Sequence, residues 1–213
     1  EIIGADAYPI GNALPGHPFP IENVLKYART ARECSYGLYP LWHVPQAFSW
    51  GWFRKGRKDF IDMRYPTREE IRQMTWQYIA GGANGIISYS YSTIRKNTKG
   101  DEFEKAWGDT CDVAHEVKKM EDVLLSDDVT EDFAEGCKAL PKYLPVRFYR
   151  HEGRVWMLAV NATREPMKSM INTPSPCRNL RTVLGGGATV LPDGRSIELD
   201  LPPMGYAFVS FMH

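Results

Sequence analysis

Apolar runs of strand length alternate with helical patterns along the first 125 residues. The strand-like runs are Ile2–Tyr8, Leu41–Phe48 and Gly85–Tyr91. The helical patterns cover about residues 21–34, 67–80 and 103–125. A strand followed by a helix, repeated three times, predicts parallel strands, because each helix carries the chain back to the start of the next strand.

The helix at about residues 67–80 has the clearest local signals. Thr67 is followed three residues later by Glu70, which is the spacing of a capping box, and Gly81 and Gly82 stand at the far end. These residues predict a helix that begins after Thr67 and ends before Gly81.

The pattern changes after Leu125. Short alternating runs follow, separated by turn signals such as His151-Glu152-Gly153 and Asp193-Gly194. This spacing is typical of an antiparallel β-sandwich. The sequence therefore predicts two domains, an α/β part at residues 1–125 and a sandwich domain at residues 126–213.

Composition excludes several classes of function. The chain has 26 basic and 26 acidic residues, so it lacks the basic excess of a nucleic-acid or membrane-surface protein. No apolar run approaches the roughly 20 residues of a membrane-spanning helix. We find no dinucleotide, phosphate-loop or metal-ligand motif, so neither a cofactor nor a metal is expected. The sequence opens within a strand that looks buried, which indicates that it is part of a longer protein.

Several segments resemble (β/α)8-barrel glycoside hydrolases of clan A. Asp6-Ala7-Tyr8-Pro9 is similar to the end of the sixth strand, Pro40–Phe48 to the seventh, and the passage from Thr67 to Ile86 to the helix and strand that close the barrel. The segment Trp107–Leu125 is similar to the closing helix before an accessory β-domain. The resemblance implies that residues 1–125 are strands 6–8 of a TIM barrel, followed by the β-sandwich.

The resemblance also implies where the chemistry lies. Barrel enzymes carry their active site at the C-terminal ends of the strands, where we expect a catalytic Asp6. Six residues are expected to bind substrate at this rim: Tyr8, Gln46, Trp50, Trp52, Tyr89 and Tyr91. Glycoside hydrolysis uses two carboxyl groups, and Gln46 stands where clan A enzymes have a nucleophilic Glu. The second carboxylate is therefore expected upstream of residue 1.

Each candidate has a structural alternative. Asp6, at a strand end, is also the kind of residue that caps a turn or pairs with a basic neighbour, and Gln46 is equally suited to packing inside the barrel. The Trp50-Gly51-Trp52-Phe53 loop suits a wall on which sugars stack, or aromatic packing under the loop. His43 is interpreted as a core histidine. Asp59, Asp62, Asp101 and Glu102 are interpreted as solvated charges.

Two functions remain open from the sequence. The first is a secreted or periplasmic hydrolase of oligo- or polysaccharides, completed by a missing N-terminal half of the barrel. The alternative is a non-catalytic carbohydrate-binding protein with a degenerate barrel. The four cysteines show no metal spacing; Cys34 and Cys111 are expected to be buried free thiols, whereas Cys137 and Cys177 are candidates for a disulfide in an exported protein.

Overall fold

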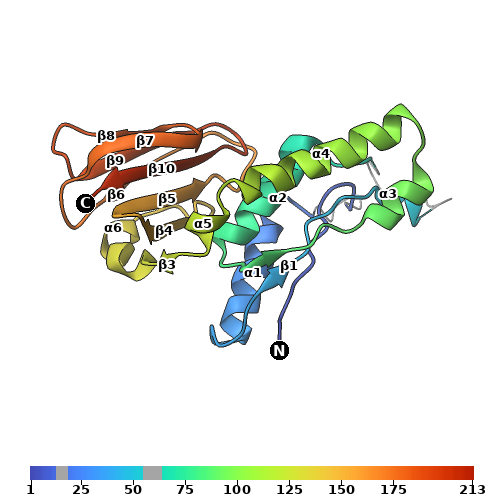
Figure 1. Cartoon of the computed structure of the whole chain (residues 1–213), viewed down its shortest axis with the longest axis horizontal. Helices are drawn as coiled ribbons and strands as arrows, with labels where there is room; N and C mark the ends of the chain where they lie inside the picture. Colours follow the sequence, from blue (N-terminus) through green and yellow to red (C-terminus); the bar gives the residue numbers. More distant parts are fainter. Residues whose placement is uncertain (13–18, 55–63) are drawn as a thin grey trace. The chain divides into compact units, whose positions relative to one another are not determined.

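The chain consists of two compact units, Glu1–Lys118 and Lys119–His213. The computed structural model describes residues 1–12, 19–54 and 64–213 (Figure 1). The domain boundary predicted from the sequence, after residue 125, lies a few residues beyond the boundary between these two units. Each unit has its own secondary structure.

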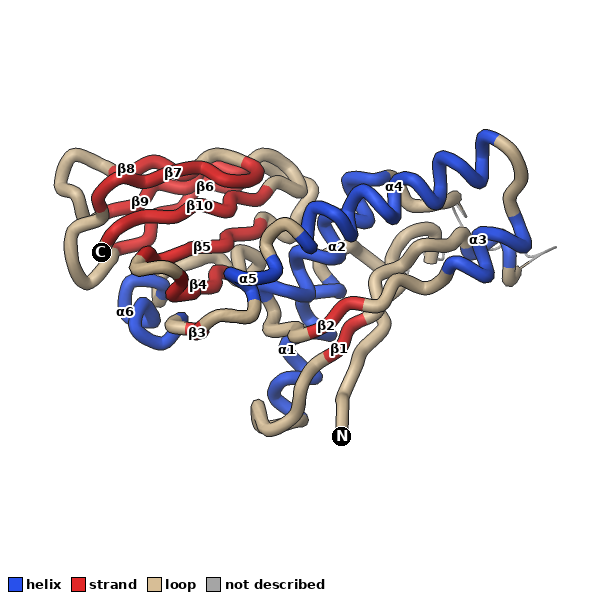
Figure 2. Tube along the Cα trace, in the orientation of Figure 1, coloured by secondary structure: helices blue, strands red, loops and turns tan. Residues whose placement is uncertain are grey.

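Three parallel segments form the centre of the first unit. Strand β1 (Trp42–His43) pairs with strand β2 (Gly85–Ile86), and the N-terminal segment pairs with the other edge of the β1 segment through Ile3 and Leu41. The two strands lie side by side in Figure 2, with the N-terminal segment running next to them. The predicted parallel order is therefore present.

The strands are much shorter than the sequence predicts. Pro40 and Pro45 bracket β1, and a proline has no N–H to donate to a sheet. The predicted strand Gly85–Tyr91 is also wrong at its end. The Ser90 hydroxyl accepts a hydrogen bond from the N–H of Thr93, which makes Ser90 the N-cap of a short helix, α3 (Tyr91–Asn97).

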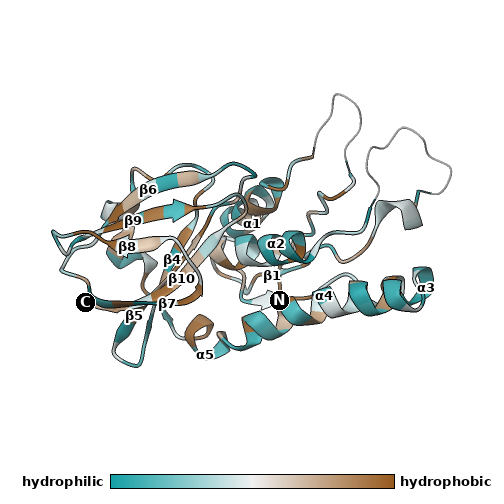
Figure 3. Cartoon of the chain, turned by 90° about the horizontal axis from the view of Figure 1, so that it is seen from above, coloured by the Kyte–Doolittle hydropathy of each residue, from teal (hydrophilic) through white to brown (hydrophobic). Residues whose placement is uncertain are grey.

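Three longer helices accompany the parallel segments. They are α1 (Asn23–Cys34), α2 (Arg68–Ala80) and α4 (Asp101–Lys118). Helices α1 and α2 approach closely, since a Cβ at Gly81 would lie 2.5 Å from the Cβ of Ala28. Helix α4 carries hydrophobic positions at intervals between hydrophilic ones (Figure 3). The single helix predicted at 103–125 is two helices, because the chain turns at Lys119–Met120 before α5 (Glu121–Leu124).

An ion pair supports the start of α2. The predicted capping box is present between Thr67 and Glu70. In addition, the Arg64 guanidinium donates two hydrogen bonds to the Glu70 carboxylate, at 2.6 and 2.7 Å. Glu70 is buried, so its charge depends on these donors. The sequence pattern gave no signal for Arg64.

The second unit contains two antiparallel sheets, as predicted. The larger sheet has the strand order β3-β4-β5-β10-β7 and the smaller one β6-β9-β8. The larger sheet consists of β3 (Asp127–Asp128), β4 (Val146–His151), β5 (Arg154–Val160), β10 (Tyr206–Met212) and β7 (Arg178–Gly185). The smaller consists of β6 (Met167–Asn172), β9 (Ser196–Leu201) and β8 (Ala188–Val190). Short helices η2 (Thr130–Phe133) and α6 (Ala134–Cys137) precede β4.

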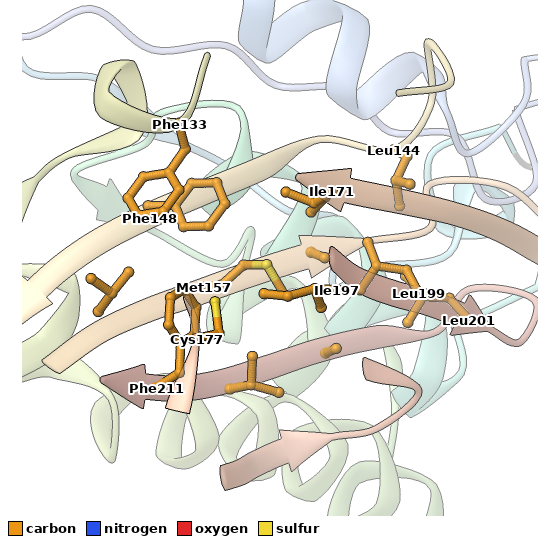
Figure 4. Close-up of a cluster of buried hydrophobic side chains, with 14 residues drawn as sticks. Phe133, Leu144, Phe148, Met157, Ile171, Cys177, Ile197, Leu199, Leu201 and Phe211 are labelled. Carbon is orange, nitrogen blue, oxygen red and sulfur yellow. The ribbon is translucent and has the colours of Figure 1, made fainter. Parts of the chain in front are cut away.

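Both sheets contribute side chains to one core (Figure 4). Alternate residues of β5 and β10, such as Met157 and Phe211, meet Ile197 and Leu199 of β9 there. The ring of Phe133 stacks on that of Phe148, with centroids 4.0 Å apart. Buried and exposed residues alternate along most of β9, as the two-residue period of a half-buried strand requires. Strands β5 and β10 are instead buried on both faces over most of their length.

The cysteines are free thiols in this structure, so the disulfide considered for Cys137 and Cys177 is not formed. Burial raises the pKa of the Cys137 thiol to about 11. Cys34 is exposed and Cys111 is half-buried, which corrects the expectation that both are buried. Among the described residues, no helix is long and apolar enough to span a bilayer.

We expect Glu70→Ala to lower the free energy of unfolding by about 2 kcal/mol, because it removes the capping-box contact and the hydrogen bonds with the partly exposed Arg64. The neighbouring Glu69 is exposed, and Glu69→Ala should cost less than about 1 kcal/mol. Urea unfolding followed by circular dichroism measures both. Equal losses in the two variants would contradict the role given to the ion pair.

Candidate functional site

The parallel pairing brings the ends of three segments to one edge. Ala5 accepts a hydrogen bond from the N–H of Val44, and Tyr89 donates one to Pro45 and accepts one from Ala47. Residues that follow these positions therefore lie at a common rim. This is the edge at which parallel α/β proteins carry their ligands.

The N-terminal segment has a buried side and an open side at this rim. The N–H of Ala7 donates to the Tyr78 hydroxyl of α2 at 2.7 Å, which holds Ala7 against the helices. Asp6 and Tyr8 flank Ala7, and Asp6 is exposed whereas Tyr8 is half-buried. Because side chains alternate along an extended segment, Asp6 and Tyr8 share the open side.

Five aromatic rings meet beside Asp6, and we call them the rim aromatic group. The members are Tyr8, Phe48, Trp50, Phe53 and Tyr89. The Tyr8 ring centroid lies 5.0 Å from that of Phe48, 6.3 Å from Trp50 and 6.0 Å from Tyr89. Phe48 is buried and forms the base of the group, while Tyr89 is exposed.

The Tyr8 hydroxyl is neutral. Its pKa is raised above the ordinary value, mainly by burial and further by the negative charge of Asp6, which lies close to it. A neutral phenol can donate a hydrogen bond to a carboxylate. Tyr8 is therefore a neutral donor beside the candidate catalytic carboxylate.

Trp50 is fixed in place at the start of the short helix η1 (Trp50–Trp52). Its indole N–H donates to the backbone oxygen of Tyr8 at 3.2 Å. The guanidinium carbon of Arg54 lies 3.8 Å from the centroid of the Trp50 ring. Arg54 thus occupies one face of the indole, so that face does not form the sugar-stacking wall expected from the sequence.

The other two aromatic candidates belong to a second group of contacts. Trp52 stacks on Tyr65 and packs against Ala47, Ile94 and Ala106. Tyr91, on α3, lies edge-on to Trp107 of α4 with ring centroids 4.8 Å apart. Trp52 is thus largely a packing residue, and Tyr91 is exposed at the start of α3 rather than at a strand end.

Gln46 is completely buried and does not face the rim. Its Oε1 accepts from the N–H of Ile10 at 2.9 Å, and its Nε2 donates to the oxygens of Ile10 and Phe48, both at 2.9 Å. The side chain therefore fastens two rim loops to each other. This geometry corrects the expectation that Gln46 binds substrate and favours the packing alternative.

His43 is a core histidine, as interpreted from the sequence. It is fully buried, its Nδ1 lies 3.0 Å from the N–H of Ala5, and its ring stacks on Tyr78 at 4.6 Å. Burial lowers its pKa, so the ring is neutral and Nδ1 accepts the Ala5 proton. Asp101 and Glu102 are exposed in the first turn of α4, whereas Asp59 and Asp62 lie outside the described residues.

Similarity to known proteins is found in the fold and not in the sequence. No family model and no curated protein matches the sequence. The fold is similar to that of an α-amylase from Anoxybacillus, with a TM-score of 0.54, 11% identity, and coverage of 90% of this chain and 45% of that one. An α-amylase from H. orenii gives a TM-score of 0.51, 10% identity, and coverage of 98% and 49%.

A putative α-galactosidase/melibiase from Bacteroides fragilis is similar to the same extent, with a TM-score of 0.50, 10% identity, and coverage of 99% and 42%. The chain therefore spans about half the length of these structures, and it matches the C-terminal part of α-amylase-like glycoside hydrolases. The resemblance to glycoside hydrolases is thereby confirmed at the level of the fold. Similarity at this identity concerns the fold and not the activity.

We expect Gln46→Glu to destabilise the protein by about 3 kcal/mol at pH 7, because a buried carboxylate would face two carbonyl oxygens. Such a site raises the folded-state pKa above the unfolded value of about 4.3, so the loss of stability grows as the pH rises through about 4.3. Thermal unfolding at pH 4 and pH 7 measures this difference.

Gln46→Met is the matched control, since it removes the hydrogen bonds without adding a titrating group. Its loss of stability should be the same at both pH values. A Gln46→Glu protein that is as stable as the parent at pH 7 and gains hydrolytic activity would show that Gln46 stands at the reacting centre after all.

Proposed function

We propose that this chain forms the C-terminal part of a glycoside hydrolase that acts on oligo- or polysaccharides at the rim. One observation carries the proposal. An exposed carboxyl group, Asp6, stands at the end of a parallel segment, close to Tyr8, whose ring lies 6.0 Å from that of Tyr89 in the rim aromatic group. A carboxyl group next to aromatic faces suits both the chemistry and the binding of sugars.

Asp6 is proposed to act as acid or base on the glycosidic bond. Hydrolysis requires one carboxyl group to protonate the leaving oxygen and a second one to attack the anomeric carbon or to activate water. The Tyr8 hydroxyl orients the Asp6 carboxylate, while Tyr89 and the accessible part of Trp50 contact the sugar. The reaction proposed here involves no cofactor or metal.

The second carboxylate is proposed to come from strands that this chain does not contain. Four side chains on the open side of the parallel segments are large and exposed: Ile2 by 56%, Trp42 by 41%, Ile87 by 51% and Tyr89 by 43%. Parallel sheets are normally covered on both faces. We propose that the missing strands of a barrel cover this face, and that they bring the second carboxylate to within about 5–10 Å of Asp6.

The alternative is a protein that binds carbohydrate without cleaving it. The position of Gln46 favours this alternative. Where the resemblance implies a nucleophilic carboxylate, the central segment carries a buried amide that donates hydrogen bonds to the backbone of neighbouring loops. The rim aromatic group serves binding equally well in both functions. Export from the cell, as a secreted or periplasmic protein, is proposed for both, since long polysaccharides are met outside the cell.

In the complete protein, Asp6→Asn should reduce kcat by at least about 1000-fold, because an amide can neither donate a proton nor carry the negative charge. Trp50→Ala should mainly raise KM, since it removes contacts shared by the ground and transition states. Reducing-sugar release from a panel of polysaccharides measures both effects.

Asp101→Asn is the control, because Asp101 is exposed in the first turn of α4. Its kcat and KM should equal those of the parent. Unchanged turnover in Asp6→Asn would exclude Asp6 from the chemistry. A complete protein that binds glycans but cleaves none would favour the binding alternative.

The exposed face makes a separate prediction for the isolated chain of 213 residues. The chain should self-associate through this face. The double variant Ile2→Ser/Ile87→Ser should associate less, because it exposes less apolar surface to water and association then buries less of it. Light scattering coupled to gel filtration reports the mass. If the parent chain is monomeric at all concentrations, this result would contradict the proposal that missing barrel strands cover this face.

A further inference from the structure

One end of the larger sheet in the second unit carries cationic side chains on the face that points away from the core. Ser210 of β10 stands opposite Trp156 of β5 on one side and opposite Arg181 of β7 on the other. Arg178 of β7 is paired with Met212, two positions further along β10. Cross-strand partners share a face, and so do residues two positions apart. These side chains therefore lie together at the end of the sheet where β10 stops, near the C-terminus (Figure 1).

Arg154 is fixed across this end of the sheet. Its Nε donates to the Ser210 Oγ at 3.1 Å, and its Nη2 donates to the backbone oxygens of Asn179 and Ser210 at 2.7 and 3.1 Å. Its Nη1 has no hydrogen-bond partner among the residues that the structure describes. A guanidinium that is ordered before a ligand arrives loses less side-chain entropy on binding.

The positive charge of this face is not neutralised by ion pairs. Arg178 and Arg181 are exposed, and neither forms an ion pair with any described residue. Arg147 of the same sheet differs, because it donates to the carboxylate of Asp128 at 2.8 Å. The chain has equal numbers of basic and acidic residues, so this face is a local excess of positive charge. Such an excess attracts anions.

Trp156 places an aromatic ring beside these cations. The ring is half-buried, its indole N–H donates to the backbone oxygen of His151 at 3.3 Å, and its centroid lies 6.1 Å from that of buried Phe208. Glu152, in the turn between β4 and β5, is exposed and offsets one of the three arginine charges. A fixed aromatic face suits contact with a sugar ring. The combination favours a ligand that is both anionic and built of sugars.

We propose that this end of the larger sheet binds an anionic polysaccharide. The guanidinium groups bind carboxylate or sulfate groups of the polymer, and Trp156 contacts a sugar ring between them. The cations are spread over three strands, and neighbouring strands lie about 4.8 Å apart. The ligand is therefore an extended chain with several charges and not a single small anion. This inference goes beyond the proposed function, since it concerns the second unit and does not require cleavage at the rim.

Calorimetric titration of the complete protein with three polymers of matched length and backbone tests the proposal. They are carboxymethyl dextran, dextran sulfate and neutral dextran, and the first two distinguish which anionic group is bound. At least one anionic polymer should bind at least about tenfold more tightly than dextran. The double variant Arg178→Gln/Arg181→Gln should lose this affinity about tenfold or more, because it removes two charges from exposed side chains.

Lys168→Gln/Arg195→Gln is the matched control. It also removes two exposed positive charges, but from β6 and from the turn before β9, which belong to the smaller sheet. This variant should keep the affinity of the parent. An equal loss in both double variants, or equal affinity of the parent for all three polymers, would overturn the proposal. A DNA duplex that binds more tightly than either anionic polymer, and depends on Arg178 and Arg181, would overturn the assignment to a polysaccharide.

Discussion

Hydrogen bonding on both sides of residues 41–47 holds the first unit together. The N-terminal segment pairs with one edge of this stretch and the β2 segment with the other, both in parallel. Parallel pairing forces the three segments to end at the same edge. Asp6, Tyr8 and Tyr89 are neighbours for this reason, although more than 80 residues separate Tyr8 from Tyr89 in the sequence.

Side chains continue the connection where the regular strands stop. The Gln46 amide joins the loop at Ile10 to the one at Phe48, the Trp50 indole bonds to Tyr8, and Arg54 bonds to Asn12. These bonds add to the backbone hydrogen bonds that continue beyond β1, where Tyr89 donates to Pro45 and accepts from Ala47. The same side chains therefore hold together the loops at the ends of the parallel segments, on the edge where Asp6 lies.

The sequence predicts features that depend on local signals. The capping box of Thr67 and Glu70, the parallel order, and the antiparallel sheets of the second unit all follow from patterns within a few residues. Other features depend on side chains that meet in space. Examples are the hydrogen bonds of buried Gln46, the contact of Arg54 with Trp50, and the ion pair between Arg64 and Glu70. No periodicity encodes such contacts, because each depends on the direction of single side chains at loop positions.

A crystal structure of the complete protein with a bound oligosaccharide tests the central claim, that the rim of the parallel segments is the carbohydrate site. We expect a sugar within about 3 Å of the Asp6 carboxyl group and in contact with the rim aromatic group. A saccharide bound to the sheets of the second unit, with the rim left empty at saturating concentration, would contradict it.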